Sequence, residues 1–230
     1  MMARKLVVEA IGTFFLVFTV GMVVTASSPP PLAALAVGAV LMVMVFAGGH
    51  ISGAHYNPAV TLAIFLRGRA SSRDLMGYWV SQLIAGLLAG ALARFFAEVA
   101  ATPDNLDFLL AGLAEFIFSF GLAYVVLNTA TTRGTEGNSY YGLAIGFTVF
   151  AGAVAVGPVS GAVFNPAVAL GLLTLGAITP NAFLLYVAAT LAGAATAALV
   201  FKALDMGNDK PTTATPAEQG KLKQAGSTRG

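Results

Sequence analysis

Long apolar runs, separated by short polar or proline-containing breaks, dominate the pattern of this chain. A helix of about 20 apolar residues crosses a hydrocarbon core of about 30 Å. Six runs have that length, and we expect membrane spans at about residues 6–26, 32–52, 75–100, 108–129, 139–158 and 179–204. The break at Gly157-Pro158 is expected to end the fifth span.

Two further apolar runs are too short to cross a membrane. They lie at about residues 57–67 and 165–174, and each holds about ten residues. A helix of that length rises about 15 Å, which is half of the hydrocarbon core. A half-length apolar segment between full spans indicates a re-entrant element. The predicted fold class is therefore an all-α membrane protein with six transmembrane helices and two re-entrant half-helices.

Each half-length run begins with the same short motif. The sequence Ser-Gly-Ala-His-Tyr-Asn-Pro-Ala-Val fills residues 52–60, and Ser-Gly-Ala-Val-Phe-Asn-Pro-Ala-Val fills residues 160–168. Agreement in register over such a stretch indicates an internal repeat, with Asn57 and Asn165 108 positions apart. Asparagine is a good N-cap and proline suits the first helical position. A helix is therefore predicted to begin at each Asn-Pro pair.

The repeat extends into the long spans, because the run from Glu9 to Phe15 resembles the run from Glu115 to Phe120. Each half, 1–104 and 105–204, then holds three spans with a half-helix after the second. Three is an odd number, so the second half must insert upside down relative to the first. We expect an inverted repeat with its site where the halves meet. The remaining tail, 205–230, is rich in Thr, Pro, Gly and Lys and is predicted to be disordered.

Composition and charge support a membrane protein. The 230 residues are 57% hydrophobic and 10% charged, with a mean hydropathy of +0.83. Almost all lysines and arginines fall on one predicted side, so we expect both termini in the cytoplasm and the chain in the cell membrane. The exception is Arg94, which we expect to pair with Glu98. The net charge of +2 is spread over flanking segments and favours no nucleic-acid partner.

Few side chains are suited to catalysis or metal binding. The chain has no cysteine, which excludes disulfides and thiol chemistry. Its two histidines, His50 and His55, have no nearby acid or thiol to complete a metal site. With no nucleophile–base pair or phosphate loop in the sequence, we expect neither an enzyme nor a bound cofactor. A passive channel, a secondary transporter built on an inverted repeat, and a non-conducting structural protein remain as hypotheses.

The predicted half-helices point their N-termini at each other near the membrane centre. Such ends carry unsatisfied N–H groups and about half a positive charge each. Capping uses the side-chain oxygens of Asn57 and Asn165, and we expect it to leave each amide NH2 free to donate into a pore. A centre of this kind accepts neutral hydroxylic solutes and repels cations.

The segments before the two Asn-Pro pairs are predicted to be extended. Irregular backbone persists at membrane depth only where it is buried in protein or lines water. We expect their carbonyls to line the pore as a ladder of acceptors. The residues concerned are Gly53, Ala54, His55, Tyr56, Gly161, Ala162, Val163 and Phe164. A purely structural role for these loops is the alternative.

The run from Gly49 to Thr61, with the second motif at 160–168, resembles the aquaporins, the major intrinsic protein family. The resemblance covers residues 5–204. It implies a right-handed six-span bundle in the lipid bilayer, a homotetramer, and one pore per subunit for water and small neutral solutes. Exclusion of cations by half-helix dipoles is an established property of that family.

The resemblance also assigns roles to particular residues. The Asn-Pro-Ala motifs, Asn57-Pro58-Ala59 and Asn165-Pro166-Ala167, are expected at the pore centre. Glu9 and Glu115 are expected to anchor the re-entrant loops by hydrogen bonds. Taken alone, a buried glutamate in a span also fits a proton or ion site.

At the filter positions the chain departs from the family. Counted as the family counts them, these positions hold Val37, Ala153, Ala162 and Val168. Most members have arginine where Val168 stands, and glycerol facilitators have aspartate where this chain has Ala169. A ring of the four residues is wide and apolar, which favours passage of glycerol, urea, ammonia or neutral metalloid acids such as arsenite. An ordinary water-selective channel is the alternative.

Overall fold

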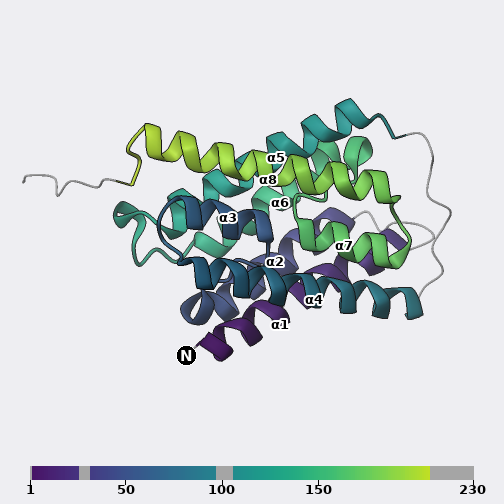
Figure 1. Ribbon diagram of the computed structural model, residues 1–230, viewed down its shortest axis with the longest axis horizontal. Coiled ribbons are helices and arrows are strands. Elements are labelled where there is room, and N and C mark those ends of the chain that lie inside the picture. The colour runs from purple at the N-terminus through teal and green to yellow at the C-terminus, as the bar shows by residue number, and fades with distance from the viewer. Residues whose placement is uncertain (1, 26–31, 97–105, 208–230) are drawn as a thin grey trace, which may run out of the picture.

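The structure is a computed structural model, which describes residues 2–25, 32–96 and 106–207 (Figure 1). Over these ranges the chain is helical and forms no strand. The long helices are α1 (Met2–Thr25), α2 (Ala33–Ser52), α4 (Ser72–Phe96), α5 (Phe108–Ala130), α6 (Tyr141–Ser160) and α8 (Pro180–Ala203). The short ones are α3 (Pro58–Leu66), α7 (Pro166–Leu175) and the 3-10 turn η1 (Arg133–Thr135).

Each of the six long helices in the described part of the chain is long and apolar enough to cross a membrane. They coincide with the six predicted spans. Large apolar side chains face outward, and Phe95, Leu109 and Leu184 are 85%, 71% and 65% exposed. An apolar surface of this extent suits lipid and not water. The predicted all-α membrane fold with six spans and two half-helices is confirmed.

The half-helices α3 and α7 have 9 and 10 residues, and Figure 1 shows them end to end among the long helices. Each packs mainly against a long helix from the other half of the chain, α3 on α8 and α7 on α4. Glycines allow the close approach. A Cβ at Gly86 would lie 2.5 Å from the carbonyl oxygen of Ala167, and a Cβ at Gly90 would lie 2.2 Å from that of Gly171.

Several helix boundaries differ from the prediction by a few residues, and α6 and α4 show the physical reason. Helix α6 continues past Pro158 to Ser160. Proline lacks the backbone N–H that donates within a helix, but Pro158 lies in the last turn, so the missing hydrogen bond does not interrupt a longer helix. The helix ends instead at Gly161, which has φ +84° and donates its N–H to the carbonyl of Gly157.

Helix α4 begins earlier than predicted because its first turn is capped. The hydroxyl of Ser71 accepts from the N–H of Asp74, and the Asp74 carboxylate accepts from the N–H of Ser71, both at 3.1 Å. Asp74 also pairs with Lys5 of α1 at 3.6 Å. Helices α1 and α4 therefore begin at the same end of the bundle. The predicted partner of Arg94, Glu98, lies outside the described residues, as does most of the predicted tail.

Candidate functional site

The N-termini of α3 and α7 are capped by two asparagines. The Oδ1 of Asn57 accepts hydrogen bonds from the N–H groups of Ala59 (2.8 Å) and Val60 (3.4 Å). The Oδ1 of Asn165 accepts one from the N–H of Ala167 (2.9 Å). Each half-helix therefore begins where the Asn-Pro pair predicts.

Each asparagine also reaches across to the opposite loop. The Nδ2 of Asn57 donates to the carbonyl of Phe164, and the Nδ2 of Asn165 donates to the carbonyl of Tyr56, both at 2.9 Å. The prediction that the whole NH2 group is free was therefore wrong, because a carbonyl of the other half lies within reach. An amide nitrogen has two hydrogens. One hydrogen of each amide has no partner among the described residues, and both asparagines line a cavity.

The two loops before the caps are not extended as predicted. Ala54, Tyr56, Ala162 and Phe164 have φ between +49° and +55°. This left-handed conformation is uncommon for residues with a side chain and costs about 1–2 kcal/mol at each. Other contacts must therefore hold the loops in place.

Glu9 of α1 holds the first loop. Its carboxylate accepts hydrogen bonds from the N–H groups of His55 (3.0 Å) and Tyr56 (2.7 Å). It also accepts from the hydroxyl of Ser52 (2.7 Å) and the Nε2 of Gln82 (2.9 Å). Glu9 is fully buried, and a buried carboxylate is stable only with such a set of donors.

Glu115 of α5 holds the second loop in the same way. Its carboxylate accepts from the N–H groups of Val163 (2.8 Å) and Phe164 (2.6 Å) and from the hydroxyl of Ser160 (2.7 Å). Successive N–H groups in a backbone that alternates in handedness form a concave anion site, here filled by a side chain. The two glutamates thus make the contacts that the resemblance implied.

This anchoring turns the loop carbonyls away from the glutamates. In a trans peptide the N–H and C=O groups point in opposite directions. The N–H groups of residues 55, 56, 163 and 164 point at the carboxylates, so the carbonyls of Ala54, His55, Ala162 and Val163 point the other way. All four residues line the cavity beside the caps. Their carbonyls accept no hydrogen bond from the described parts of the chain.

The other four carbonyls of the predicted ladder have different surroundings. Those of Tyr56 and Phe164 accept from the asparagines, as described. Gly53 and Gly161 are not among the residues that line the cavity, and they end α2 and α6 in the left-handed conformation. A place for Gly53 and Gly161 in the ladder stays a prediction.

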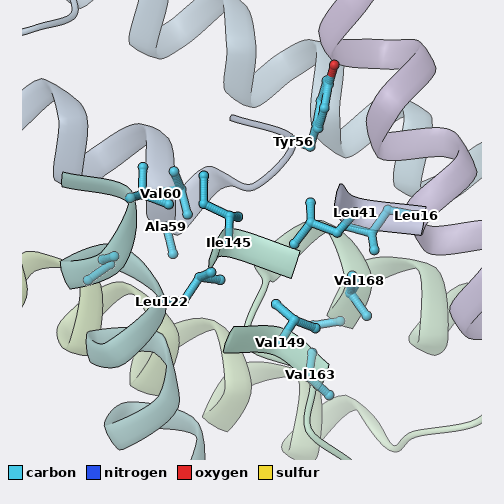
Figure 2. Close-up of a cluster of buried hydrophobic side chains, with 14 of the residues drawn as sticks. Leu16, Leu41, Tyr56, Ala59, Val60, Leu122, Ile145, Val149, Val163 and Val168 are labelled. Atoms are coloured by element: carbon cyan, nitrogen blue, oxygen red, sulfur yellow. The ribbon is translucent and has the colours of Figure 1, made fainter. Parts of the chain in front are cut away.

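The groups that line the cavity are of two kinds. The polar ones are the two asparagines, His55 and the four carbonyls. The apolar ones, here called the wall, are Leu16, Val20, Val37, Leu41, Val60, Leu122, Val126, Ile145, Val149, Phe164 and Val168. Figure 2 shows several of these side chains pointing toward a common centre from different helices. No acid, lysine or arginine lines the cavity within the described residues.

Three of the four predicted filter residues, Val37, Ala162 and Val168, line this cavity. Ala153 does not, and Val149, one turn earlier on the same face of α6, does. Val168 is 3% exposed, so its side chain is held in the wall. The place of Ala153 in the filter ring stays a prediction.

Sequence reasoning missed several residues that support the loops. Tyr78 and Tyr186 donate their hydroxyls to the carbonyls of Ser52 (2.6 Å) and Ser160 (2.7 Å). The two tyrosines lie 108 positions apart, so the offset of the asparagines identifies them as a pair. Gln82 has no such partner, and no sequence signal marks it. Within the described residues no group of three or more His, Cys, Asp or Glu side chains is placed to hold a metal ion.

Six apolar spans, two capped half-helices and a lined cavity between them define a multi-pass membrane channel. The family model described as "Major intrinsic protein" matches residues 1–161 and 104–226. Nodulin-26 of Glycine max is 35% identical over 231 residues, which cover 96% of this chain and 84% of that protein. Aquaporin NIP1-2 of Arabidopsis thaliana is 33% identical over 227 residues, covering 90% and 76%.

The chain belongs to the major intrinsic protein family, whose members are passive channels for water and small solutes and are not enzymes. A solved structure agrees with this assignment. The aquaglyceroporin from Plasmodium falciparum superimposes with a TM-score of 0.76 over 90% of this chain and 100% of that chain. At 16% sequence identity this likeness shows a common fold.

Proposed function

We propose that this channel conducts small uncharged solutes, namely glycerol, urea and neutral metalloid acids such as arsenite, together with water. The observation that carries the proposal is the side chain of Val168 in a cavity wall that holds no acid, lysine or arginine. A valine is shorter than arginine and does not fill the filter. Its surface also tolerates the carbon skeleton of a solute.

The two faces of the cavity suit solutes with both hydroxyl groups and an apolar side. Hydroxyl or N–H groups of a solute can donate to the carbonyls of Ala54, His55, Ala162 and Val163, which have no protein donor among the described residues. Its acceptors can meet the remaining N–H of Asn57 or Asn165. The apolar side then lies against the valines and leucines of the wall.

The same site favours exclusion of ions. A cation at the caps would leave water and meet two helix N-termini and two amide donors. Neither Glu9 nor Glu115 lines the cavity, and each accepts at least three hydrogen bonds. We therefore favour loop anchors over an ion or proton site, and a channel over a coupled transporter.

We further propose that the chain consists of two inverted half-repeats, 1–104 and 105–204, and assembles as a homotetramer with a pore in each subunit. Glu9 and Glu115 make corresponding contacts in the two halves, and so do Tyr78 and Tyr186. This correspondence supports the half-repeats. The resemblance to the family supports the tetramer. The one-sided distribution of lysine and arginine supports a cell membrane with both termini in the cytoplasm.

Stopped-flow light scattering on proteoliposomes tests the proposed solutes with water, glycerol, urea and arsenite gradients on the same vesicles. We expect fast, unsaturating flux of water and of the solutes. Conduction of water alone would support an ordinary water channel. Saturation with dependence on a proton or sodium gradient would support a transporter.

Val168→Arg tests the filter. We expect it to lower glycerol and arsenite flux by about tenfold or more while water flux stays within about threefold, because the long cationic side chain narrows the ring. Val168→Met is the matched control, since it has a long side chain without the charge. Equal loss of water and solute flux, or loss of neither, would contradict the position of Val168 in the filter.

A further inference from the structure

The two halves of the pore differ in one buried polar network. In the first half a line of side chains runs from Glu9 through Gln82 and Thr61 to His55, which lines the cavity. The positions 108 residues after His55, Thr61 and Gln82 hold Val163, Ala169 and Thr190. The second half therefore has no counterpart of this network.

The direction of each hydrogen bond in the network follows from its end at Glu9. A carboxylate only accepts, so the Gln82 group 2.9 Å from it must be the amide nitrogen. The same nitrogen donates its second hydrogen to the Oγ1 of Thr61 at 3.1 Å. Gln82 and Thr61 are both fully buried, so water does not replace these bonds.

The hydroxyl of Thr61 connects this network to His55. A hydroxyl has one hydrogen and two lone pairs. Its nearest acceptor is the carbonyl of Asn57 at 2.9 Å, while the Oε1 of Gln82 lies farther away at 3.5 Å, and one lone pair accepts from the Nε2 of Gln82. The Nδ1 of His55 lies 3.1 Å from the same oxygen. With the hydroxyl hydrogen on the carbonyl of Asn57, a bond between Oγ1 and Nδ1 requires the hydrogen on Nδ1, which makes Nε2 of a neutral ring an acceptor.

The Nε2 of His55 is open to the cavity. It has no hydrogen-bond partner among the described residues, yet it is not one of their fully buried polar atoms without a partner. The ring is also fixed in orientation, since it meets the ring of Tyr78 edge to face with centroids 4.9 Å apart. These contacts place Nε2 beside the caps.

We propose that the Nε2 of His55 is a hydrogen-bond acceptor site for the O–H or N–H groups of passing solutes, and that Thr61 and Gln82 are positioning residues that set its tautomer. The site rests on the proposed function, because it acts only on solutes that enter the pore. A hydroxyl or amide solute donates to His55 while it accepts from Asn57 or Asn165. Val163 offers no such group, so the two sides of the caps differ in chemistry.

Solid-state NMR of the imidazole nitrogens in 15N-labelled protein in lipid vesicles tests the tautomer. The His50→Gln variant of the full chain has a single histidine, and His50 is exposed on α2. We expect a protonated Nδ1 and an unprotonated Nε2 with a ratio of about tenfold or more over the other tautomer. A protonated Nε2, in a neutral or a cationic ring, would overturn the proposal.

Variants of Thr61 test the positioning role. We expect Thr61→Val to remove the preference for a protonated Nδ1 and to lower urea and glycerol flux by about two- to tenfold. Thr61→Ser keeps the hydroxyl, so the preference for a protonated Nδ1 and the urea and glycerol flux should stay near the wild-type values. Thr190→Val is the matched control in the other half, where the hydroxyl donates to the carbonyl of Val187. An unchanged tautomer in Thr61→Val would contradict the role of Thr61.

The two measurements separate this inference from the proposed function. If the protein shows a protonated Nδ1 and an unprotonated Nε2 but conducts no solute, the proposed solutes are refuted and the proposed tautomer of His55 still holds. Solute flux with a protonated Nε2 would refute the acceptor site alone. The wild-type spectrum decides the tautomer even if Thr61→Val does not fold.

Discussion

Replacing Glu115 by glutamine tests whether a single carboxylate holds the second loop. The substitution keeps the shape of the side chain and exchanges one acceptor oxygen for an NH2 donor. The hydroxyl of Ser160 can turn and accept from the new group, but the backbone N–H groups of Val163 and Phe164 cannot. Either orientation of the glutamine amide therefore leaves one loop N–H facing a donor.

The magnitude follows from the three hydrogen bonds that are changed. An unsatisfied buried donor costs about 1–3 kcal/mol, and hydrogen bonds to a charged acceptor are stronger by about 1 kcal/mol than neutral ones. A total loss of about 2–5 kcal/mol results. The left-handed residues Ala162 and Phe164 cost about 2–4 kcal/mol together. Since the loss is of the same size as this strain, we expect the loop to relax and the pore to change shape.

Thermal unfolding in detergent by circular dichroism, together with stopped-flow water flux, measures the effect. At about 2–4 °C per kcal/mol for a chain of this size, we expect Glu115→Gln to lower the midpoint by roughly 5–15 °C and to reduce water flux. Glu136→Gln is the matched control, because Glu136 is exposed after η1. It should change the stability by less than about 0.5 kcal/mol.

An unchanged midpoint with unchanged flux in Glu115→Gln would refute the anchoring argument. It would mean that the loop keeps its left-handed residues without a charged acceptor. A lower midpoint with normal flux would also count against it. The loop residues themselves line the cavity, so a change in the loop conformation should change the flux.

Two further substitutions test the caps and the packing of the half-helices. Asn165→Asp keeps an acceptor for the cap but places a negative oxygen near the carbonyl of Tyr56, which now lies 2.9 Å from the amide nitrogen. We expect the leak of protons or potassium ions into vesicles to rise by about tenfold or more. An unchanged leak would argue against exclusion of cations at the caps. Gly90→Ala brings a Cβ to 2.2 Å from a backbone oxygen of α7 and should cost more than about 2 kcal/mol in thermal unfolding, whereas Gly121→Ala, with nothing within 4 Å, should be neutral or stabilising.

The sequence predicts the parts of this site that depend on local rules. The six spans follow from apolar length, and the starts of α3 and α7 follow from the capping preference of asparagine and proline. The pairing of Glu9 with Glu115 follows from the repeat together with the resemblance. These features depend on residues close in sequence or on a repeated spacing.

Features that depend on contacts between distant segments were wrong or absent in the prediction. The loops were expected to be extended because glycine and small residues allow it, but two bonds to one carboxylate require left-handed residues at Ala54 and Tyr56. The asparagine amides were expected to be free because the neighbouring sequence does not show that the opposite loop lies within hydrogen-bonding distance. Counting along the chain did not find Val149 in the cavity, since the rotation of α6 depends on its neighbours.

The reciprocal bonds at the caps mean that neither half is chemically complete by itself. Asn57 donates a hydrogen bond to a carbonyl in the second half, and Asn165 donates one to a carbonyl in the first half. A half-length polypeptide, produced alone, would satisfy these groups only by associating with another half in the opposite orientation. Co-expression of the two pieces as separate chains should therefore rebuild the conduit, while either piece alone should not.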